Sequence, residues 1–429
     1  MAPPKGGYAP TLEKFLDTLK SKPVEASVES LISLLKRRQI QGAESCALAT
    51  AHILLQVVAR DKWLNVDQLL ERVQSVGRRL VAASPRELTI GNIIRRILGL
   101  IRDEAEEDRN EETGNATPAD SPDPPVASPL TIDSAVAKVI RPAFPTAQST
   151  LTRTQSMFNI LADPDSVPPG WMNSTPLASS GASTPLGHNF PTNTSALRSE
   201  VLDGIEEIMD EIKQVDDQLC SYSDIIIHPG DYILVYKPSR TVQRFLTRSK
   251  RKFTLFVVTD PSAQSGPDPY ASLRKSLAAN GSILISIMNA GLMAYMTKVN
   301  KVILSARALT GTGGVTADAG AASVARAARS QGRTVIVLGG VYKLSPDSQV
   351  TQSIATEWGN PSAYVDFSDG QLVGKTTVKN AVSEFIPAGD INAYITNLGA
   401  HSREHLHTVI SDHYKEADVA LDLYAKIRK

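Results

Sequence analysis

The sequence predicts an α/β protein in two folded parts, an all-helical N-terminal domain followed by a domain built on a doubly wound parallel sheet. Apolar residues recur at helical spacing over residues 10–105, whereas beyond residue 195 short apolar runs alternate with helical patterns. A third observation separates the two parts, because thirteen of the 26 prolines lie between residues 113 and 194.

Length and composition limit the possible functions. A chain of 429 residues can bury a substantial core in more than one unit. Its 45 basic residues are balanced by 45 acidic residues, so it has no net positive charge that would attract nucleic acid or an anionic membrane. Cys46 and Cys220 lie far apart in predicted helices, which excludes a disulfide framework and a four-cysteine zinc site. No targeting segment is visible, and the apolar stretch from Ile283 to Met296 is too short to span a bilayer, so we expect a cytoplasmic protein.

Residues 1–105 are expected to form the helical domain. Amphipathic patterns begin at Leu12 and Val28, and the run "AESCALATAHILLQVVARDKW" is apolar on most sides, which is typical of a central helix. Asn65 is expected to cap the next helix. The sequence "SPRE" at residues 84–87 matches a capping box with proline at the first helical position, opening a further helix.

Residues 106–194 are expected to form an insertion that is acidic at first and then rich in proline and serine. This composition buries too little apolar surface to offset chain entropy, which predicts that most of the insertion is disordered. Residues 151–163, "LTRTQSMFNILAD", contain several large apolar side chains and could dock on a folded surface.

Residues 195–429 are expected to form the α/β domain, which opens with a long amphipathic helix. The predicted strands are "DYILVYK", "FTLFVVTD", "SILISIM", "KVILSA" and "TVIVLGG", each separated from the next by a helical pattern. Ligands of such domains bind at the carboxyl ends of the strands, where the loops 236–240, 260–269 and 311–320 are expected.

The loop "GTGGVTADAG", Gly311 to Gly320, lies between a predicted strand and a predicted helix. It does not match the dinucleotide fingerprint, since the sixth position counted from Gly311 is Thr316, and no phosphate-binding P-loop pattern occurs in the chain. Backbone N–H groups at Gly313 and Gly314 could bind an anion. We favour the alternative interpretation, a tight strand-to-helix turn.

The string "HSREH" matches the H-x-x-E-H signature, in which His401 and His405 would bind zinc and Glu404 would activate water. That chemistry needs a third ligand well downstream, but the remaining residues resemble a single amphipathic tail. We therefore expect a solvated helix face and no metal, and no other motif predicts a catalytic residue or a cofactor.

Arg240, Arg244 and Arg248 are spaced to form a stripe along one helix face. Most sites that bind single-stranded nucleic acid combine basic residues with aromatic side chains on the same surface. The stripe has no aromatic residue among its positions. We expect a solvated or subunit-facing stripe and no direct contact with nucleic acid.

The stretch from Met293 to Pro346, which contains "VNKVILSA" and "YKLSP", resembles the regulatory subunits of eukaryotic translation initiation factor two-B, and within that family the beta branch. The strings "ILVYKPSRTVQRFL", "RKFTLFVVTD" and "FIPAGDINAYITNLG" support the resemblance, as does the order of a helical domain, a variable insertion and a Rossmann-like domain. The long insertion departs from shorter relatives.

The resemblance extends to sugar-phosphate isomerases of the same fold. Alignment by eye places Lys237 where those enzymes have a cysteine, Gly314 where they have an aspartate, and Asp318 where they have a lysine. A glycine cannot transfer a proton and a lysine is not a thiol, so isomerisation, or binding of a sugar phosphate, is kept only as the alternative function.

The resemblance implies a non-catalytic regulatory subunit of the guanine-nucleotide exchange factor for initiation factor two, with exchange carried out by the gamma and epsilon subunits. Its implied partners are the alpha, delta, gamma and epsilon subunits in a hetero-oligomer, and initiation factor two through its alpha subunit, whose phosphorylation the complex senses. Pairing would use the Rossmann-like domains, and the helical domains would meet the substrate. Segment 392–424 is expected to lie at a subunit contact. The candidate interface residues are Lys237, Arg240, Arg244, Asn392, Tyr394, Asn397 and His401.

Overall fold

The computed structural model describes residues 12–114, 194–259, 268–347, 356–365 and 374–419, together with residues 368 and 370. The predicted docking segment 151–163 and the chain beyond Val419 lie outside the described residues. The predicted disorder of most of the insertion, and the possible docking of residues 151–163, therefore stay predictions.

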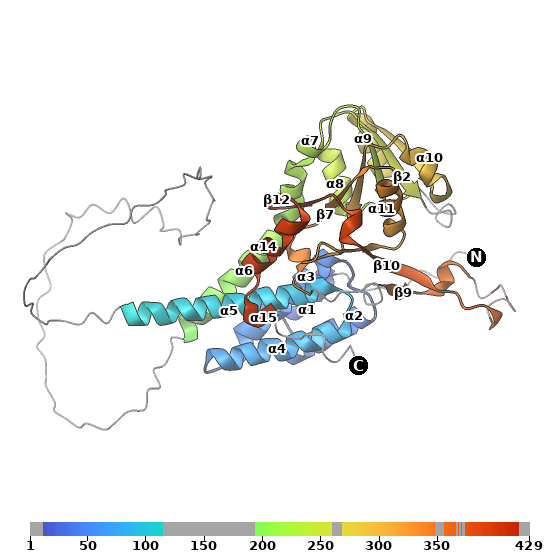
Figure 1. Cartoon of the computed structure of the whole chain (residues 1–429). Helices are drawn as coiled ribbons and strands as arrows, with labels where there is room; N and C mark the ends of the chain where they lie inside the picture. Colours follow the sequence, from blue (N-terminus) through green and yellow to red (C-terminus); the bar gives the residue numbers. More distant parts are fainter. Residues whose placement is uncertain are drawn as a thin grey trace, which may run out of the picture. The chain divides into compact units, whose positions relative to one another are not determined.

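Six helices form the N-terminal part of the described chain and the entry to the sheet domain (Figure 1). Their apolar faces pack into one core, and α3 at its centre is buried on most sides, as its sequence predicted. Their bounds are α1 Leu12–Leu19, α2 Val24–Lys36, α3 Ala43–Arg60, α4 Val66–Ala83, α5 Leu88–Gly114 and α6 Thr194–Ser221.

The structure confirms one predicted helix boundary and corrects two others. The Asn65 side chain accepts a hydrogen bond from the Gln68 amide and caps α4, as predicted. Pro85 does not open a helix, because residues 84–87 form a turn and α5 begins at Leu88. The acidic residues 106–114 belong to α5 and not to the insertion, because the helix continues past the predicted boundary.

The larger sheet has seven strands in the order β12-β11-β7-β4-β1-β2-β3. All neighbours are parallel except β11 and β12. Without β12 the order corresponds to 3-2-1-4-5-6, the strand order of Rossmann folds, which confirms the predicted fold class. The strands are β1 Tyr232–Tyr236, β2 Thr254–Thr259, β3 Ile283–Met288, β4 Lys301–Ser305, β7 Thr334–Leu338, β11 Ala393–Thr396 and β12 Gly399–His401.

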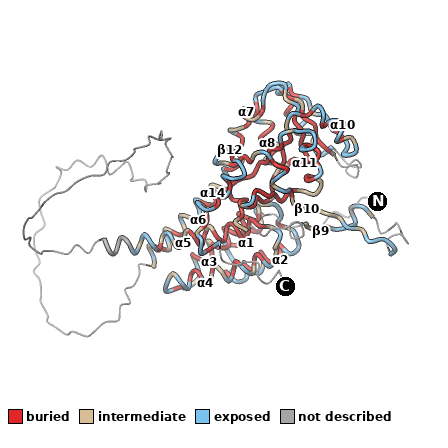
Figure 2. Tube along the Cα trace, in the orientation of Figure 1, coloured by how far each residue is buried: buried red, intermediate tan, exposed pale blue. Residues whose placement is uncertain are grey.

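Helices cover both faces of this sheet (Figure 1), and much of the chain in this part is buried (Figure 2). Alternate residues of β1 point to opposite sides, so Ile233 and Val235 join the core shared with α6, α8 and α9, while Leu234 and Tyr236 join the core shared with α10, α11 and α14. The helices are α7 Ser223–Ile226, α8 Arg240–Arg248, α9 Ala271–Ala279, α10 Leu292–Met296, α11 Ala321–Ser330, α14 Arg403–His413 and α15 Glu416–Val419, and the short 3-10 turns are η3 Asn289–Gly291, η4 Val341–Lys343, η5 Pro361–Ala363 and η7 Ala388–Asp390.

A second sheet of five strands, which the sequence analysis did not predict, lies at the carboxyl end of β4. Its order is β8-β5-β6-β10-β9, and β6 pairs antiparallel with both β5 and β10. The predicted single strand-to-helix turn at residues 311–320 is therefore wrong, because this stretch contains the β5–β6 turn and all of β6. The strands are β5 Ala308–Thr310, β6 Val315–Asp318, β8 Leu344–Ser345, β9 Glu357–Gly359 and β10 Asn380–Ile386.

A row of polar side chains along α5 binds residues of the α/β part. The Arg95 side chain is 1% exposed, and its two terminal nitrogens each donate to a carboxylate oxygen of Asp347 at 2.9 Å. Asn92 donates to the Tyr342 carbonyl, and Arg102 donates to both carboxylate oxygens of buried Asp418 at 3.2 Å. Ion pairs that are buried and hydrogen-bonded in this way fix the position of α5.

Removing the Asp347 carboxylate should destabilise the protein strongly. Asp347→Ala removes the carboxylate that pairs with the buried guanidinium of Arg95 and leaves it only neutral acceptors such as the Asp418 carbonyl, which costs about 3–5 kcal/mol. The matched control is Glu29→Ala, which breaks the exposed pair with Arg79 and costs at most about 1 kcal/mol. Thermal and urea denaturation of both variants measure the difference, and equal shifts of the midpoints would contradict the importance of Arg95.

Candidate functional site

The strand order reverses between β1 and β4, and the carboxyl ends of these strands are the position where a Rossmann-like domain binds its ligands. Lys237 directly follows β1 and has a positive φ of 41°, a conformation that is rare for a lysine. Its ammonium group lies 5.3 Å from the ring centroid of Tyr236. Arg307 follows β4 at the same end of the sheet.

The glycine loop beside this position is closely packed. The Tyr394 hydroxyl donates to the Gly313 carbonyl, and a Cβ atom on Gly314 would lie 2.2 Å from Cζ of Phe385. Gly314, which aligns with the isomerase aspartate, therefore has an aromatic ring where a side chain would extend. The loop is a β-turn between two strands, and Gly313, with a φ of 84°, supplies its left-handed residue.

Side chains of the same chain already pair with the charged groups around the loop. Asp318 accepts a hydrogen bond from Nε of Arg307 at 2.9 Å, and Glu357 accepts one from Nη1 of the same guanidinium at 3.2 Å. Oε1 of Glu384 accepts from the backbone amides of Gly320 and Ala322, at 2.7 and 2.6 Å. These amides begin α11, where an anion would otherwise bind.

A cavity of about 220 Å³ lies between the helical part and the second sheet. Burial raises the pKa of the Cys46 thiol, which lines it, so Cys46 is a poor nucleophile there. Burial also raises the pKa of Glu87 in the same wall and lowers the pKa of Lys343, whose ammonium donates to the Ala306 carbonyl at 3.0 Å. These shifts are those of buried groups, and the described residues bring no thiolate or free base to the cavity.

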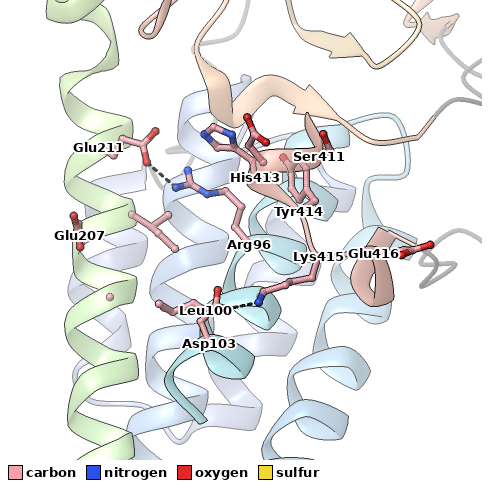
Figure 3. Close-up of a pocket in the computed structure, with 14 residues that line it drawn as sticks. Arg96, Leu100, Asp103, Glu207, Glu211, Ser411, His413, Tyr414, Lys415 and Glu416 are labelled. Carbon is pink, nitrogen blue, oxygen red and sulfur yellow. Dashed lines mark hydrogen bonds and ion pairs between the residues drawn. The ribbon is translucent and has the colours of Figure 1, made fainter. Parts of the chain in front are cut away.

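A larger groove of about 730 Å³ runs between α5, α6 and the connection from α14 to α15 (Figure 3). Arg96 pairs with Glu211 at 2.7 Å and Lys415 pairs with Asp103, so both cations of the lining are matched by a carboxylate. Three further carboxylates leave the groove with an excess of negative charge. They are Glu207, Asp412 and Glu416.

The seven candidate interface residues do not lie on one surface. Tyr394 and His401 are 1% and 7% exposed within the chain itself, so little of either side chain is available to a partner, and their assignment to a subunit contact stays a prediction. Arg244 pairs with Asp216 and Asp217 of α6 and its side chain is 40% exposed, whereas Arg240 and Arg248 are exposed, so the predicted stripe stays a prediction.

The remaining three candidates serve local structure. Asn392 and Asn397 each accept a hydrogen bond from a backbone amide, those of Val335 and Val341, through their side-chain oxygens. Lys237 is half-buried beside the Tyr236 ring. For these three a subunit contact stays a prediction.

The histidines of the "HSREH" string stack face to face, with ring centroids 5.1 Å apart, and do not converge on a common point. Nε2 of His401 hydrogen-bonds to the Thr396 hydroxyl at 2.7 Å, and burial lowers the pKa of His401. Among the described residues, no three His, Cys, Asp or Glu side chains are grouped as metal ligands would be. No described helix has the length and apolar character needed to cross a membrane.

The chain thus has a helical region joined to a Rossmann-like domain, and ion pairs of the chain itself fill the strand-end position. This arrangement defines a class of proteins related in fold to sugar-phosphate isomerases. The model of the Initiation factor 2 subunit family matches residues 39–402. The chain belongs to this family.

Its relatives include beta subunits of eIF2B. The translation initiation factor eIF2B subunit beta of Schizosaccharomyces pombe is 32% identical over 419 residues, covering 95% of this chain and all of that protein. Two crystal structures from Chaetomium thermophilum, eIF2B beta alone and the tetrameric eIF2B-beta2-delta2 complex, are each 37% identical with a TM-score of 0.64. They cover 96% and 94% of this chain, and 98% and 100% of the matched chains.

An enzyme is a more distant relative. The ribose 1,5-bisphosphate isomerase of Haloferax volcanii is 23% identical over 212 residues, covering 48% of this chain and 64% of the enzyme. The match shows a shared ancestry for part of the chain. The match covers less than half of this chain.

Adding a side chain at Gly314 should destabilise the protein. Gly314→Ala forces the Phe385 ring to move, and such overpacking costs about 1–3 kcal/mol. Gly374→Ala is the matched control, because a Cβ there meets no atom within 4 Å. Thermal denaturation compares the two variants, and a Gly314→Ala midpoint equal to that of the control would contradict the packing seen here.

Proposed function

We propose that this protein is a regulatory beta subunit of eIF2B, the guanine-nucleotide exchange factor for translation initiation factor two, and that it performs no catalysis itself. The observation that carries the proposal lies at the carboxyl ends of the parallel strands, where related folds bind ligands. There Asp318 and Glu357 pair with Arg307, and the carboxylate of Glu384 caps α11. A site whose charged groups pair with one another suits a packing function. The protein acts in the cytoplasm, where initiation takes place.

The delta subunit is the first partner that we assign, because the Chaetomium thermophilum beta protein forms a tetrameric complex with it. The outer edge of β3 and the adjoining α10 suit such a contact. Ile283, Met288 and Met293 are 61%, 52% and 49% exposed, and β3 pairs with one neighbour only among the described strands. An exposed edge strand with clustered apolar side chains is a typical protein contact.

Placing charge on this edge should prevent assembly. A double variant, Ile283→Lys and Met288→Lys, should fold normally and lose at least about 90% of co-purification with a tagged delta subunit, because desolvating two ammonium groups opposes the contact. Leu64→Lys is the control, since Leu64 is 82% exposed in the helical part. If the double variant still assembles like the control, β3 is not the pairing edge.

We assign the alpha subunit of initiation factor two to the helical part. The acidic groove between α5 and α6 supports this assignment, because carboxylates exceed cations along its lining. On the same helix, burial raises the pKa of Glu104, and neighbouring carboxylates, including that of Asp103 in the groove, raise it further. A surface of this kind attracts a partner with a basic face.

Reversing one charge in the groove should weaken this interaction. Glu207→Lys should lower the affinity for the isolated alpha subunit about fivefold to tenfold at low salt, with a smaller effect at high salt because exposed charges are screened. Glu13→Lys on α1 is the control, since Glu13 is also exposed. Titration by interferometry measures both, and an unchanged affinity of Glu207→Lys would rule out the groove as the contact.

The alternative function, a sugar-phosphate isomerase, is decided by a direct assay. Incubation of the purified chain with ribose 1,5-bisphosphate, followed by product analysis, should show no conversion above the buffer rate. Turnover by the chain would overturn the non-catalytic proposal without affecting its place in the family.

A further inference from the structure

A cluster of four basic side chains lies at the end of α8 and in the loop that follows it. Arg248 belongs to the last turn of the helix, and Lys250, Arg251 and Lys252 come directly after the C-cap residue Ser249. All four are exposed. The helix dipole stabilises a cation within the last turn, so it accounts for Arg248 and does not account for the other three. These four residues are called the basic cluster below.

The charge of the basic cluster is not neutralised within the part of the chain that the structure describes. Asp216 and Asp217 pair with Arg244, and Asp231 pairs with Lys301, so the neighbouring carboxylates are engaged with other cations. None of the four basic side chains forms an ion pair with a described carboxylate. A chain with 45 basic and 45 acidic residues therefore has a local excess of positive charge here.

Asp224 of α7, which lies beside α8 (Figure 1), connects the basic cluster to an exposed apolar side chain. Its Oδ1 atom accepts hydrogen bonds from the Ser249 hydroxyl and the Lys250 amide, both at 3.0 Å. The bond from the Lys250 amide lowers the pKa of Asp224, and the charges of Arg251 and Lys250 lower it further. The next residue, Ile225, is 66% exposed. One carboxylate, four cations and an apolar side chain thus share this surface.

A hollow of about 460 Å³ adjoins the basic cluster between α6 and α8. Thr247 and Arg248 line it from α8, and Asp217 and Cys220 line it from α6. Arg244, also in the wall, pairs with Asp217. Arg248 is therefore the lining residue whose charge no described carboxylate matches.

We propose that the basic cluster, Ile225 and the hollow between α6 and α8 bind an acidic segment of a partner protein, one that also carries large apolar side chains. Carboxylates of the segment pair with the four cations, a carboxylate that enters the hollow reaches Arg248, and an apolar side chain packs on Ile225. Clusters of basic residues recognise acidic motifs, and complementary charge accelerates association. These residues differ from those that we assign to the delta subunit and to initiation factor two.

The surface suits a protein better than a nucleic acid. Sites for single-stranded nucleic acid add aromatic side chains on which bases stack, but Phe245 of α8 and Phe253, which precedes β2, are both buried. The exposed Ile225 side chain offers neither charge nor hydrogen bonds to a phosphate backbone. It offers an apolar contact, which a side chain of a peptide can use.

Peptide binding by the full-length chain tests the proposal. The probe is a fluorescein-labelled peptide of repeated Glu-Asp-Leu units, measured by anisotropy at about 50 mM salt. It should bind saturably to the wild type, and at least about fivefold more weakly at about 200 mM salt, because exposed charges are screened. In the triple variant Arg248→Ala, Lys250→Ala and Arg251→Ala the affinity should fall at least about tenfold. If the triple variant does not melt cooperatively, Arg251→Ala alone should lose about threefold.

The matched control removes equal charge from the helical part. Lys22, Arg37 and Arg78 are exposed, and changing all three to alanine should leave the affinity within about twofold of the wild type, since these charges lie beyond the screening length.

A second measurement separates the apolar contact from the charge. Ile225→Ala should weaken binding of the Glu-Asp-Leu peptide about fivefold, as truncation of a central contact residue does. The same variant should bind a peptide of repeated Glu-Asp-Ser units as the wild type does, because that peptide has no apolar side chain to pack on Ile225.

Any one of several results would overturn the proposal. They are a wild type that does not bind the Glu-Asp-Leu peptide saturably, equal affinity of the triple variant and the wild type, an equal loss in the control, and an unchanged affinity of Ile225→Ala. Tighter binding of an oligouridine of equal charge would also overturn it and would assign the surface to nucleic acid. All these measurements use the chain alone, so the inference does not rest on the proposed function and its failure leaves the eIF2B assignment intact.

Discussion

The buried guanidinium of Arg95 constrains the whole arrangement of the described chain. A charge removed from water is stable only with a partner held in place, so Asp347 must keep its position after β8. One helical turn earlier Asn92 bonds to the Tyr342 carbonyl, and two turns later Arg102 binds buried Asp418 in α15. Helix α5 is therefore attached to the α/β part at three points along its length, and residues of α5 form one wall of the acidic groove.

In this fold the carboxyl ends of the strands can form an active site, or side chains of the protein can fill the same position. A few side chains decide between the two. At the strand ends Arg307 is shared between Asp318 and Glu357, and Phe385 fills the space beside Gly314. The charged groups at this position pair with one another at short distance. A family that includes eIF2B beta subunits, and that is related to an isomerase, can thus retain the architecture of a ligand-binding domain while using it for packing.

Surfaces outside the strand ends then become the positions where function is expected. The apolar edge at β3 and α10 and the acidic groove between α5 and α6 differ in chemistry, which allows two partners to be distinguished by one subunit. An apolar edge favours a permanent contact, and a charged groove favours fast, salt-dependent and reversible binding.

The sequence by itself determined the helical part, the five main strands and their alternation with helices, because apolar periodicity is a local property of the chain. The expectation that Lys237 and Gly314 replace the isomerase cysteine and aspartate comes from the sequence alone and stays a prediction. It did not determine the second sheet, whose strands are only two to seven residues long and pair across distant segments. Only the tertiary structure decided that Glu384 caps α11, that Tyr394 and His401 are buried, and that carboxylates gather along the groove. Each of these depends on residues far apart in the sequence, whose interaction exists only once the chain has folded.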